Sequence, residues 1–269
     1  MERDELVAAA DRALAEVLRV AARHAPGAAI EEDGGVLLVS TSPTWPGPYH
    51  NGALRIDPSL PAAEVLRRAR AFFASRCAGY CVWVPDRADE DLCAAAVAAG
   101  LVLISTTGTP RMAIRASVAT RRLPDGVRLA EVVDGDGRSD YIAVTVAAYA
   151  EEGLPHDAVE AQCSCVAGAG EATPRAVLAT EGDRTVAAAM VVMAGDAASI
   201  ELVGTVPGAR GRGLGEACTA WAVNTAFASG ARVVVLEASA AGEPLYRRMG
   251  FEEVGRSRLC FGPPRDPPA

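Results

Sequence analysis

The residues with the clearest chemistry occupy positions 203–216, which read VGTVPGARGRGLGE. An apolar run before Pro207 predicts a strand, and an amphipathic pattern from Leu214 onward predicts a helix. Between them, Arg210-x-x-Gly213-x-Gly215 supplies glycines without a Cβ, so a phosphate can approach the main chain closely. Consecutive N–H groups and the positive end of the helix then point at that phosphate. The stretch therefore predicts an anion-binding cradle.

The spacing of this cradle excludes two common phosphate-binding motifs. A P-loop needs Gly-x-x-x-x-Gly-Lys-Ser/Thr, and the chain contains no lysine. The dinucleotide motif Gly-x-Gly-x-x-Gly would need a third glycine at position 216, where the chain has Glu216.

A second block of residues follows the predicted helix. Residues 232–239 (RVVVLEAS) form an apolar run that predicts a buried strand. Residues 242–251 (GEPLYRRMGF) then predict a short helix that carries Tyr246 and ends in Gly250-Phe251. In this order and at this separation, the two blocks resemble the pyrophosphate loop and the Tyr-x-x-x-Gly-Phe ending of GNAT-family N-acetyltransferases.

The resemblance implies that acetyl-CoA is the cosubstrate. In the family, main-chain groups of the loop hold the pyrophosphate, and the pantetheine arm lies between two splayed strands. Here the strand before the loop would supply main-chain partners, with an N–H near the thioester carbonyl to stabilise the oxyanion. The resemblance gives as cofactor-binding residues Val203, Thr205, Arg210, Gly211, Arg212, Gly213, Leu214, Gly215 and Ser239.

Three of these residues have plainer alternatives. Arg210 and Arg212 could add charge-assisted hydrogen bonds to phosphate, or they could be solvated charges of the loop. Ser239 could reach the cofactor, or it could be a turn or N-cap serine before the next helix.

Tyr246 is the candidate catalytic acid. It lies one helical turn before Gly250, where the resemblance places a phenol beside the sulfur of the cosubstrate. A thiol and a phenol have ordinary pKa values of about 8.5 and 10, so a phenol can protonate a departing thiolate at little cost. The alternative is a tyrosine whose ring packs between helix and sheet.

Glu201 is the candidate base that takes a proton from the amine. Strand alternation predicts that it lies on the same face as Val203 and Thr205. A carboxylate in so apolar a strand would be partly desolvated, which raises its pKa. Alternatively, Glu201 faces solvent or pairs with an arginine, and Glu237 on the neighbouring strand is the second choice of base.

An acceptor would enter between the first two helices of this part of the chain and the cosubstrate. Charged residues that could recognise a cation there are Glu151, Glu152, His156 and Asp157. A helix start capped by Asp157 is the plainer interpretation. Residues 40–52 (STSPTWPGPYHNG) could wall the acceptor pocket, or could be a rigid surface connection.

Composition and charge narrow the class of protein. A net charge of −8 argues against a nucleic-acid interface. The longest apolar run, residues 186–194, is shorter than the ~18 residues that a membrane span needs, and the N-terminus lacks a signal-peptide pattern. We therefore expect a cytoplasmic protein. Its 7 cysteines lack zinc-site spacing, which indicates reduced thiols and no metal.

The pattern of predicted elements divides the chain into tandem domains of α/β (α+β) class. Residues 1–118 are predicted to contain a helix at 67–76, a strand at 80–84, a helix at 89–99 and strands at 102–105 and 110–115. This order resembles a degenerate GNAT-like domain without the glycine loop; residues 124–262 are expected to form the catalytic domain and residues 263–269 a disordered tail. Each domain is expected to have a mixed sheet flanked by helices, with splayed strands at the cofactor site. The predicted strands of the catalytic domain are 127–133, 175–181, 185–193, 199–206, 232–238 and a closing pair; its helices are 139–150, 156–167, 214–228 and 242–249.

These features together predict an N-acetyltransferase that acts by direct transfer in a ternary complex. A second domain beside the catalytic one favours a confined pocket, and so a primary amine of a small molecule as the acceptor. The alternative is a non-catalytic acyl-CoA sensor or partner-binding module, which would tolerate loss of Tyr246. The sequence does not determine the oligomeric state, and a homodimer is one possibility.

Overall fold

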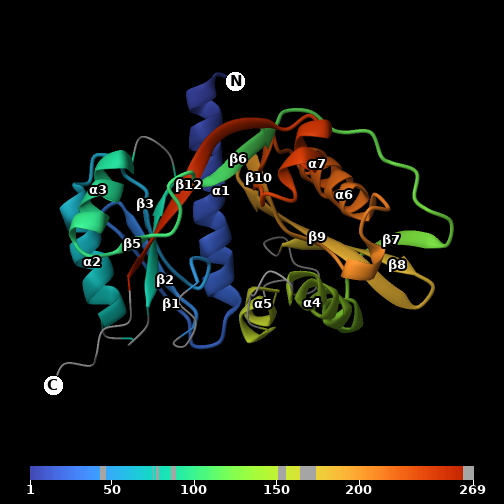
Figure 1. The fold of residues 1–269 in the computed structure, drawn as a ribbon, viewed down its shortest axis with the longest axis horizontal. Helices are drawn as coiled ribbons and strands as arrows, with labels where there is room; N and C mark the ends of the chain where they lie inside the picture. Colours follow the sequence, from blue (N-terminus) through green and yellow to red (C-terminus); the bar gives the residue numbers. More distant parts are fainter. Residues whose placement is uncertain are drawn as a thin grey trace. The chain divides into compact units, whose positions relative to one another are not determined.

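The computed structural model forms two compact units (Figure 1). It describes residues 1–42, 47–74, 76, 79–85, 89–150, 156–163 and 174–262. The first unit contains residues 1–111 together with the chain from residue 253 onward, and the second contains residues 112–252. The predicted domains, 1–118 and 124–262, follow chain order, whereas the first unit is built from two separate segments. The assignment of residues 263–269 as a tail lies outside the described residues.

In the first unit, helix α1 (Arg3–His24) is followed by three strands of an antiparallel meander. These strands are β1 (Ala29–Asp33), β2 (Val36–Ser40) and β3 (Asn51–Arg55). Helix α2 (Ala62–Ala74) then leads to β4 (Tyr80–Val84), which is parallel to β3, and α3 (Glu90–Ala98) follows. Sequence analysis predicted the helix and strand around β4 but none of the three strands of the meander.

The second unit follows the predicted order of elements closely. Its strands form the order β11-β10-β9-β8-β7, in which neighbours are antiparallel except for the parallel pair β10 and β11. The strands are β7 (Val127–Glu131), β8 (Arg175–Glu181), β9 (Arg184–Ala194), β10 (Ala197–Thr205) and β11 (Val233–Glu237). The helices are α4 (Gly135–Tyr149), α5 (His156–Cys163), α6 (Leu214–Ala228) and α7 (Glu243–Arg248).

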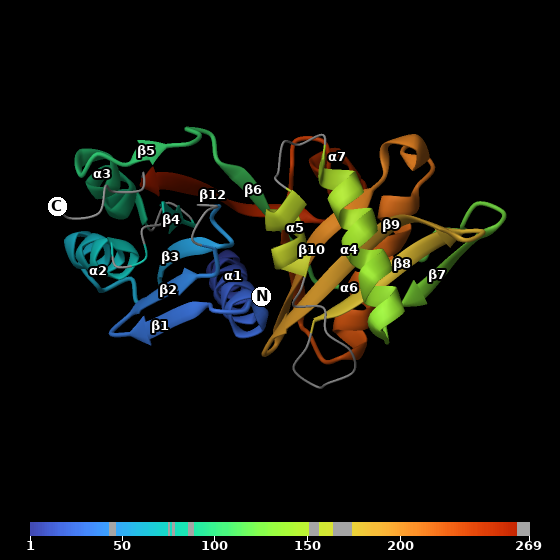
Figure 2. The same cartoon turned by 90° about the horizontal axis from the view of Figure 1, so that it is seen from below.

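Helices α4 and α6 cover opposite faces of this sheet (Figures 1 and 2). The face toward α6 is apolar: Ile200, Val234 and Leu236 pack against Ala222 and Val223 of the helix. Burial of these side chains stabilises the α6 face at roughly 25 cal/mol per Å² of apolar surface removed from water. The α4 face carries the polar side chains of the same two strands, because successive residues of a strand point to opposite faces.

The two units share one order of elements. In the first unit, three antiparallel strands, a helix, a parallel strand and a helix run from β1 to α3. In the second unit the same series runs from β8 to α7. The predicted tandem arrangement of mixed sheets flanked by helices is therefore confirmed.

The last strand of the described chain belongs to the first unit. Strand β12 (Glu252–Gly262) pairs antiparallel with β4 and with the short strand β5 (Val102–Leu103). The sequence predicted a closing strand pair in the second domain; one long strand stands there instead. Strand β6 (Thr109–Ile114) leads from the first unit into the second. Among the described residues, no helix is long and apolar enough to cross a membrane.

Candidate functional site

The parallel strands β10 and β11 separate toward their carboxyl ends. They pair at Ala197↔Val233, Ala198↔Val234 and Ser199↔Val235, and the register then stops. Strand β10 nevertheless continues to Thr205 and β11 to Glu237. Because the sheet opens between these two strand ends, main-chain groups near the split can serve a ligand instead of a neighbouring strand. The predicted splay of strands is confirmed.

A β-bulge distorts β10 beside the split. Its register with β9 passes from Glu201↔Met190 to Gly204↔Ala188, so two residues of β10 lie opposite Ala189. Leu202 has a φ of 50°, in the left-handed region that a leucine rarely adopts. An extra residue in one strand bends that strand and changes which residues face each side of the sheet.

This bulge corrects the predicted orientation of Glu201. Val203 and Thr205 face α6, where Gly215 would place a Cβ 3.4 Å from Thr205 Oγ1. Glu201 follows Ile200, which packs on the α6 face, and therefore faces α4. Gly204, on the far side of the bulge, also faces α4, since a Cβ there would lie 2.7 Å from the Ala148 side chain. Simple alternation failed because the bulge adds one residue between Glu201 and Val203.

Glu201 has the protonation behaviour expected of a base. The pKa of its carboxyl is raised to about 7, chiefly by burial and to a smaller extent by the charge of Glu237, while a hydrogen bond from Ser199 opposes the shift. The Ser199 hydroxyl donates to Glu201 Oε1 at 2.5 Å. Glu237 also belongs to the α4 face, because its neighbour Leu236 packs on the α6 face. Two carboxylates thus stand on either side of the split, on one face of the sheet.

The glycine loop leads from β10 to the start of α6. One turn of 3-10 helix (Pro207–Ala209) follows the strand, and Gly213 is the N-cap of α6. Gly211 and Gly213 have φ values of 76° and 80°, so both positions favour glycine. A Cβ at Gly211 would meet no atom within 4 Å, which leaves that part of the loop open to a ligand.

The two arginines of the loop have partners within the protein. Arg210 donates from Nε to the Thr205 carbonyl and from Nη2 to the Ala148 carbonyl, each at 3.1 Å. Arg212 pairs with both carboxylate oxygens of Glu181, at 3.0 and 2.5 Å. These bonds fix the loop to β10, α4 and β8. Direct phosphate contact by either arginine stays a prediction.

The main chain of β10 also has a contact that the sequence did not reveal. Tyr149, at the end of α4, donates its hydroxyl hydrogen to the Val203 carbonyl at 3.2 Å. The proposed pantetheine partners Val203 and Thr205 thus each have their carbonyl engaged by a side chain. A tyrosine at the end of a helix is no sequence signal by itself, so this contact of Tyr149 could not have been found from the sequence.

Tyr246 and Ser239 lie around the turn between β11 and α7. The Tyr246 ring is buried, and its centroid is 5.8 Å from that of Phe251 in an edge-on contact. A Cβ at Gly242 would lie 2.9 Å from this ring, so glycine makes room for the tyrosine. Ser239 is exposed, and its hydroxyl accepts a hydrogen bond from the Gly242 N–H at 3.2 Å. It therefore has the turn role that was left open, and its cofactor contact stays a prediction.

The predicted acceptor-recognition residues fall into two groups. Glu151 and Glu152 lie outside the described residues. His156 and Asp157 are exposed at the start of α5, and Asp157 Oδ1 accepts from the Ala158 N–H at 3.0 Å. Recognition of a cation by these residues stays a prediction, as does the role of residues 40–52, of which 43–46 lie outside the described residues.

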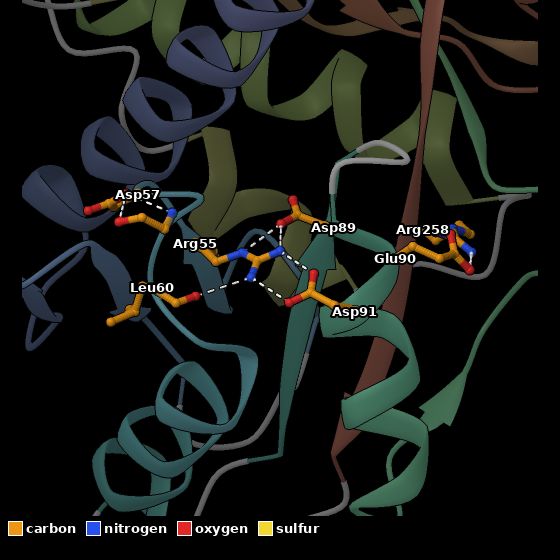
Figure 3. Close-up of polar contacts among 8 residues, drawn as sticks. Arg55, Asp57, Leu60, Asp89, Glu90, Asp91 and Arg258 are labelled. Atoms are coloured by element: carbon orange, nitrogen blue, oxygen red, sulfur yellow. Dashed lines mark hydrogen bonds and ion pairs between the residues drawn. The ribbon is translucent and has the colours of Figure 1, made fainter.

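The equivalent position of the first unit is built differently (Figure 3). Six residues, IDPSLP, connect β3 to α2, without a glycine. Arg55 at the end of β3 pairs with Asp89 and Asp91 at the start of α3 and also donates to the Leu60 carbonyl. Burial raises the pKa of Asp89, and hydrogen bonds from Arg55 oppose that rise. In the first unit, side chains therefore connect the end of β3 to the start of α3. In the second unit, the corresponding strand ends separate.

Comparisons with known proteins agree with this geometry. Residues 141–251 match the sequence model of the Acetyltransferase (GNAT) family. A GCN5-related N-acetyltransferase from Kribbella flavida has a similar structure, with a TM-score of 0.70, 23% identity and 96% of each chain covered. A GCN5-related N-acetyltransferase from Sphaerobacter thermophilus has a TM-score of 0.60 at 14% identity, over 99% of this chain and 95% of that chain.

A third similar structure is a tandem GNAT protein from the clavulanic acid biosynthesis pathway. It has a TM-score of 0.55 at 16% identity, over 91% of this chain and 86% of that chain. No protein with curated annotation matches the sequence.

The second unit combines a mixed sheet, a split between its parallel strands and a glycine loop at the start of a helix. Residues 141–251 of the second unit match the GNAT acetyltransferase model, and the fold of the chain is that of the GCN5-related N-acetyltransferases of similar structure. The similarity over almost the whole chain shows that the fold includes the tandem arrangement.

Proposed function

We propose that the second unit transfers the acetyl group of acetyl-CoA directly to a primary amine of a small molecule. The observation that carries this proposal is the split between β10 and β11, which leads to a glycine loop at the N-terminus of α6. This arrangement provides an elongated main-chain surface followed by an anion cradle, and acyl-CoA has the matching order of pantetheine arm and pyrophosphate.

The described residues fit acetyl-CoA. Gly211 leaves open space at the loop, and the left-handed conformation of Gly213 turns the chain into the first turn of α6. The N–H groups of that first turn have no carbonyl partner within the helix, so they and the helix dipole favour an anion. The residues that would hold the cosubstrate are those of β10 from Val203 to Thr205 and of the loop from Arg210 to Gly215.

When bound, acetyl-CoA would supply an activated acyl group as a thioester. Glu201, with a pKa of about 7, would accept the proton of an incoming ammonium, since it is largely ionised slightly above neutrality. Tyr246 would return a proton to the departing thiolate and be reprotonated from solvent. One amide bond forms, one thioester bond breaks, and the net proton is released to solvent.

The electrostatics of the α4 face support a cationic acceptor. Glu201 and Glu237 contribute carboxylates on opposite sides of the split, and their mutual repulsion contributes to the high pKa of Glu201. An amine that arrives as an ammonium would relieve this repulsion, which favours amines over neutral nucleophiles.

Calorimetric titration with acetyl-CoA tests the cosubstrate. Gly215→Asp adds a carboxylate at the cradle, where its Cβ makes an ordinary 3.4 Å contact. Gly135→Asp is the matched control, because it adds the same charge at the N-terminus of α4, where a Cβ meets nothing within 4 Å. We expect micromolar binding by the wild type and the control, and at least a tenfold weaker binding by Gly215→Asp.

Turnover is then measured against a panel of small primary amines. Acetylation of a member of the panel, lost in Glu201→Gln, supports the proposed reaction. A wild type that is folded but does not bind acetyl-CoA would contradict the proposal. Binding with no turnover across the panel would contradict the enzymatic part and leave the acyl-CoA sensor.

A further inference from the structure

The segment between β6 and β7 is held against helix α6 of the second unit. Asn224 of α6 accepts the Val118 N–H with Oδ1 and donates from Nδ2 to the Val118 carbonyl, both at 2.9 Å. One amide side chain therefore satisfies both main-chain groups of Val118. Beyond this anchor, the segment extends toward the N-terminus of α6.

Arg121 of this segment lies at the glycine loop. Its Nη1 donates to Glu216 Oε2 at 2.9 Å, in the first turn of α6. A Cβ at Gly213 would lie 2.5 Å from Arg121 Nε, so the guanidinium packs directly on the N-cap residue. About half of the Arg121 side chain is exposed (52%), and it lies directly beside Gly213 of the loop. A ligand at the loop can therefore reach it.

The three arginines near the loop differ in what a ligand would have to break. Arg210 holds two main-chain carbonyls, and Arg212 holds Glu181 through two hydrogen bonds. Arg121 holds the single carboxylate of Glu216, which itself stands where the helix favours an anion. A phosphate group could replace that carboxylate without releasing the loop from β8 or β10.

We propose that Arg121 is a phosphate-binding residue of the acyl-CoA site, supplied by the segment that precedes β7. In the absence of cosubstrate Glu216 occupies its guanidinium, and a phosphate group of CoA takes the place of that carboxylate. This inference rests on the proposed function. It assigns the charge-assisted phosphate contact to Arg121 in place of Arg210 and Arg212, because both of those side chains are committed to the fold.

Binding of CoA to Arg121→Ala and Arg122→Ala variants tests the assignment. Arg122 is the matched control, since it is the adjacent arginine and its side chain is 91% exposed. At equal ionic strength, we expect the Kd for CoA to rise about tenfold in Arg121→Ala, because this variant loses one charge-assisted contact. The Kd should be unchanged in Arg122→Ala. An equal loss of CoA affinity in both variants would mean that only the net charge of the protein matters, and would overturn the assignment.

Glu216→Gln separates direct contact from simple neutralisation of Glu216. If Arg121 binds phosphate, the Glu216 carboxylate competes with that phosphate for the guanidinium. The Glu216→Gln variant, which lacks this carboxylate, should therefore bind CoA more tightly than the wild type. Arg121→Ala/Glu216→Gln should then bind several-fold more weakly than Glu216→Gln. Equal affinities of these two variants would mean that Arg121 acts only by masking Glu216, and would overturn the proposal.

Dephospho-CoA, which lacks the 3′-phosphate, identifies the phosphate involved. If Arg121→Ala weakens the binding of both CoA and dephospho-CoA, Arg121 contacts the pyrophosphate. If it weakens the binding of CoA alone, Arg121 contacts the 3′-phosphate. A wild type that binds neither ligand would contradict the proposed function itself. A wild type that binds CoA with the same Kd as Arg121→Ala would contradict this inference alone.

Discussion

At the scale of single residues, the candidate site contains a carboxyl group, that of Glu201, in surroundings that disfavour its charged form. Glu201 is partly buried on an apolar strand, and Ser199 supplies one hydrogen bond. Desolvation exceeds the effect of that bond, so the pKa rises from 4.5 to about 7. This shift in pKa, which would suit the proposed base, must also lower the stability of the folded protein at neutral pH.

Glu201→Gln should therefore stabilise the protein in a pH-dependent way. Below about pH 4.5, Glu201 is protonated in both states, and the variant and wild type should differ little in this respect. Between pH 4.5 and 7 the unfolded chain loses the proton first, so the free energy of unfolding of the wild type falls. A shift of this size corresponds to about 3 kcal/mol in favour of the variant at pH 8.

Urea unfolding from pH 4 to pH 8 measures this difference. Asp140→Asn, which changes an exposed carboxylate of α4, is the control and should show no comparable trend. A stability difference between Glu201→Gln and wild type that stays constant over this range would show that Glu201 titrates normally.

Tyr246→Phe separates the acid role of this tyrosine from its packing. Phenylalanine keeps the ring contact with Phe251, so the Tm should change by no more than a few degrees. Loss of the proton donor should lower kcat about 100-fold and leave KM nearly unchanged. Steady-state kinetics with the best acceptor of the panel provide the measurement. An unaltered kcat would leave Tyr246 with its packing role.

The residues of the site were only partly predictable from the sequence. The family resemblance pointed to the loop glycines, Tyr246 and Glu201, and their roles in the site stay predictions. The predicted orientation of Glu201 was wrong, because nothing in the sequence Ile-Glu-Leu-Val-Gly indicates that Leu202 adopts a left-handed conformation. Ser199 was missed although its spacing of two residues from Glu201 puts both side chains on one face of the strand.

At the scale of elements, apolar patterns gave β8, α6 and β4 with their observed bounds. In the meander of the first unit, β2 reads VLLVS, an apolar run that was overlooked, whereas β1 and β3 lack a clear pattern. Strand β1 reads AIEED and is mostly exposed, and β3 reads NGALR, which begins with residues typical of a turn. These strands are stabilised by their neighbours, which a local sequence pattern does not reveal.

Asn224 tests how firmly one element holds the segment before β7. Asn224→Ala leaves two main-chain groups of Val118 without their side-chain partner, which should lower the free energy of unfolding by about 1–3 kcal/mol. Amide hydrogen exchange at Val118 should accelerate by at least tenfold. Thr225→Ala, the next residue of α6, is the control and should stay within about 0.5 kcal/mol of the wild type. Unchanged exchange at Val118 in Asn224→Ala would contradict the role of this contact.

At the scale of the whole molecule, chain order and structural units do not coincide. Strand β12 follows all elements of the second unit in the chain but pairs with β4 and β5 of the first. Cys260 of β12 is fully buried in the core of the first unit, together with Val82 and Leu92. The sequence could not show that β12 belongs to the first unit, because an apolar pattern predicts that a strand forms but not which strand it pairs with.

Removal of residues 253–269 should therefore damage the first unit more than the second. Hydrogen exchange should become fast in β4, which loses its neighbour, while β10 keeps its protection. A chain that ends at residue 262 retains β12 and is the control. Retained protection of β4 together with its loss in β10 would contradict the division into these two units.

The position of β12 also affects how the protein is made. As the chain leaves the ribosome, residues 112–252 emerge as one uninterrupted stretch, so the second unit can fold during synthesis. The first unit, although translated earlier, must wait for β12, and until then β4 presents an unpaired edge of the kind that promotes aggregation. The part of the chain that is synthesised first is therefore completed only by residues that are synthesised after the whole second unit.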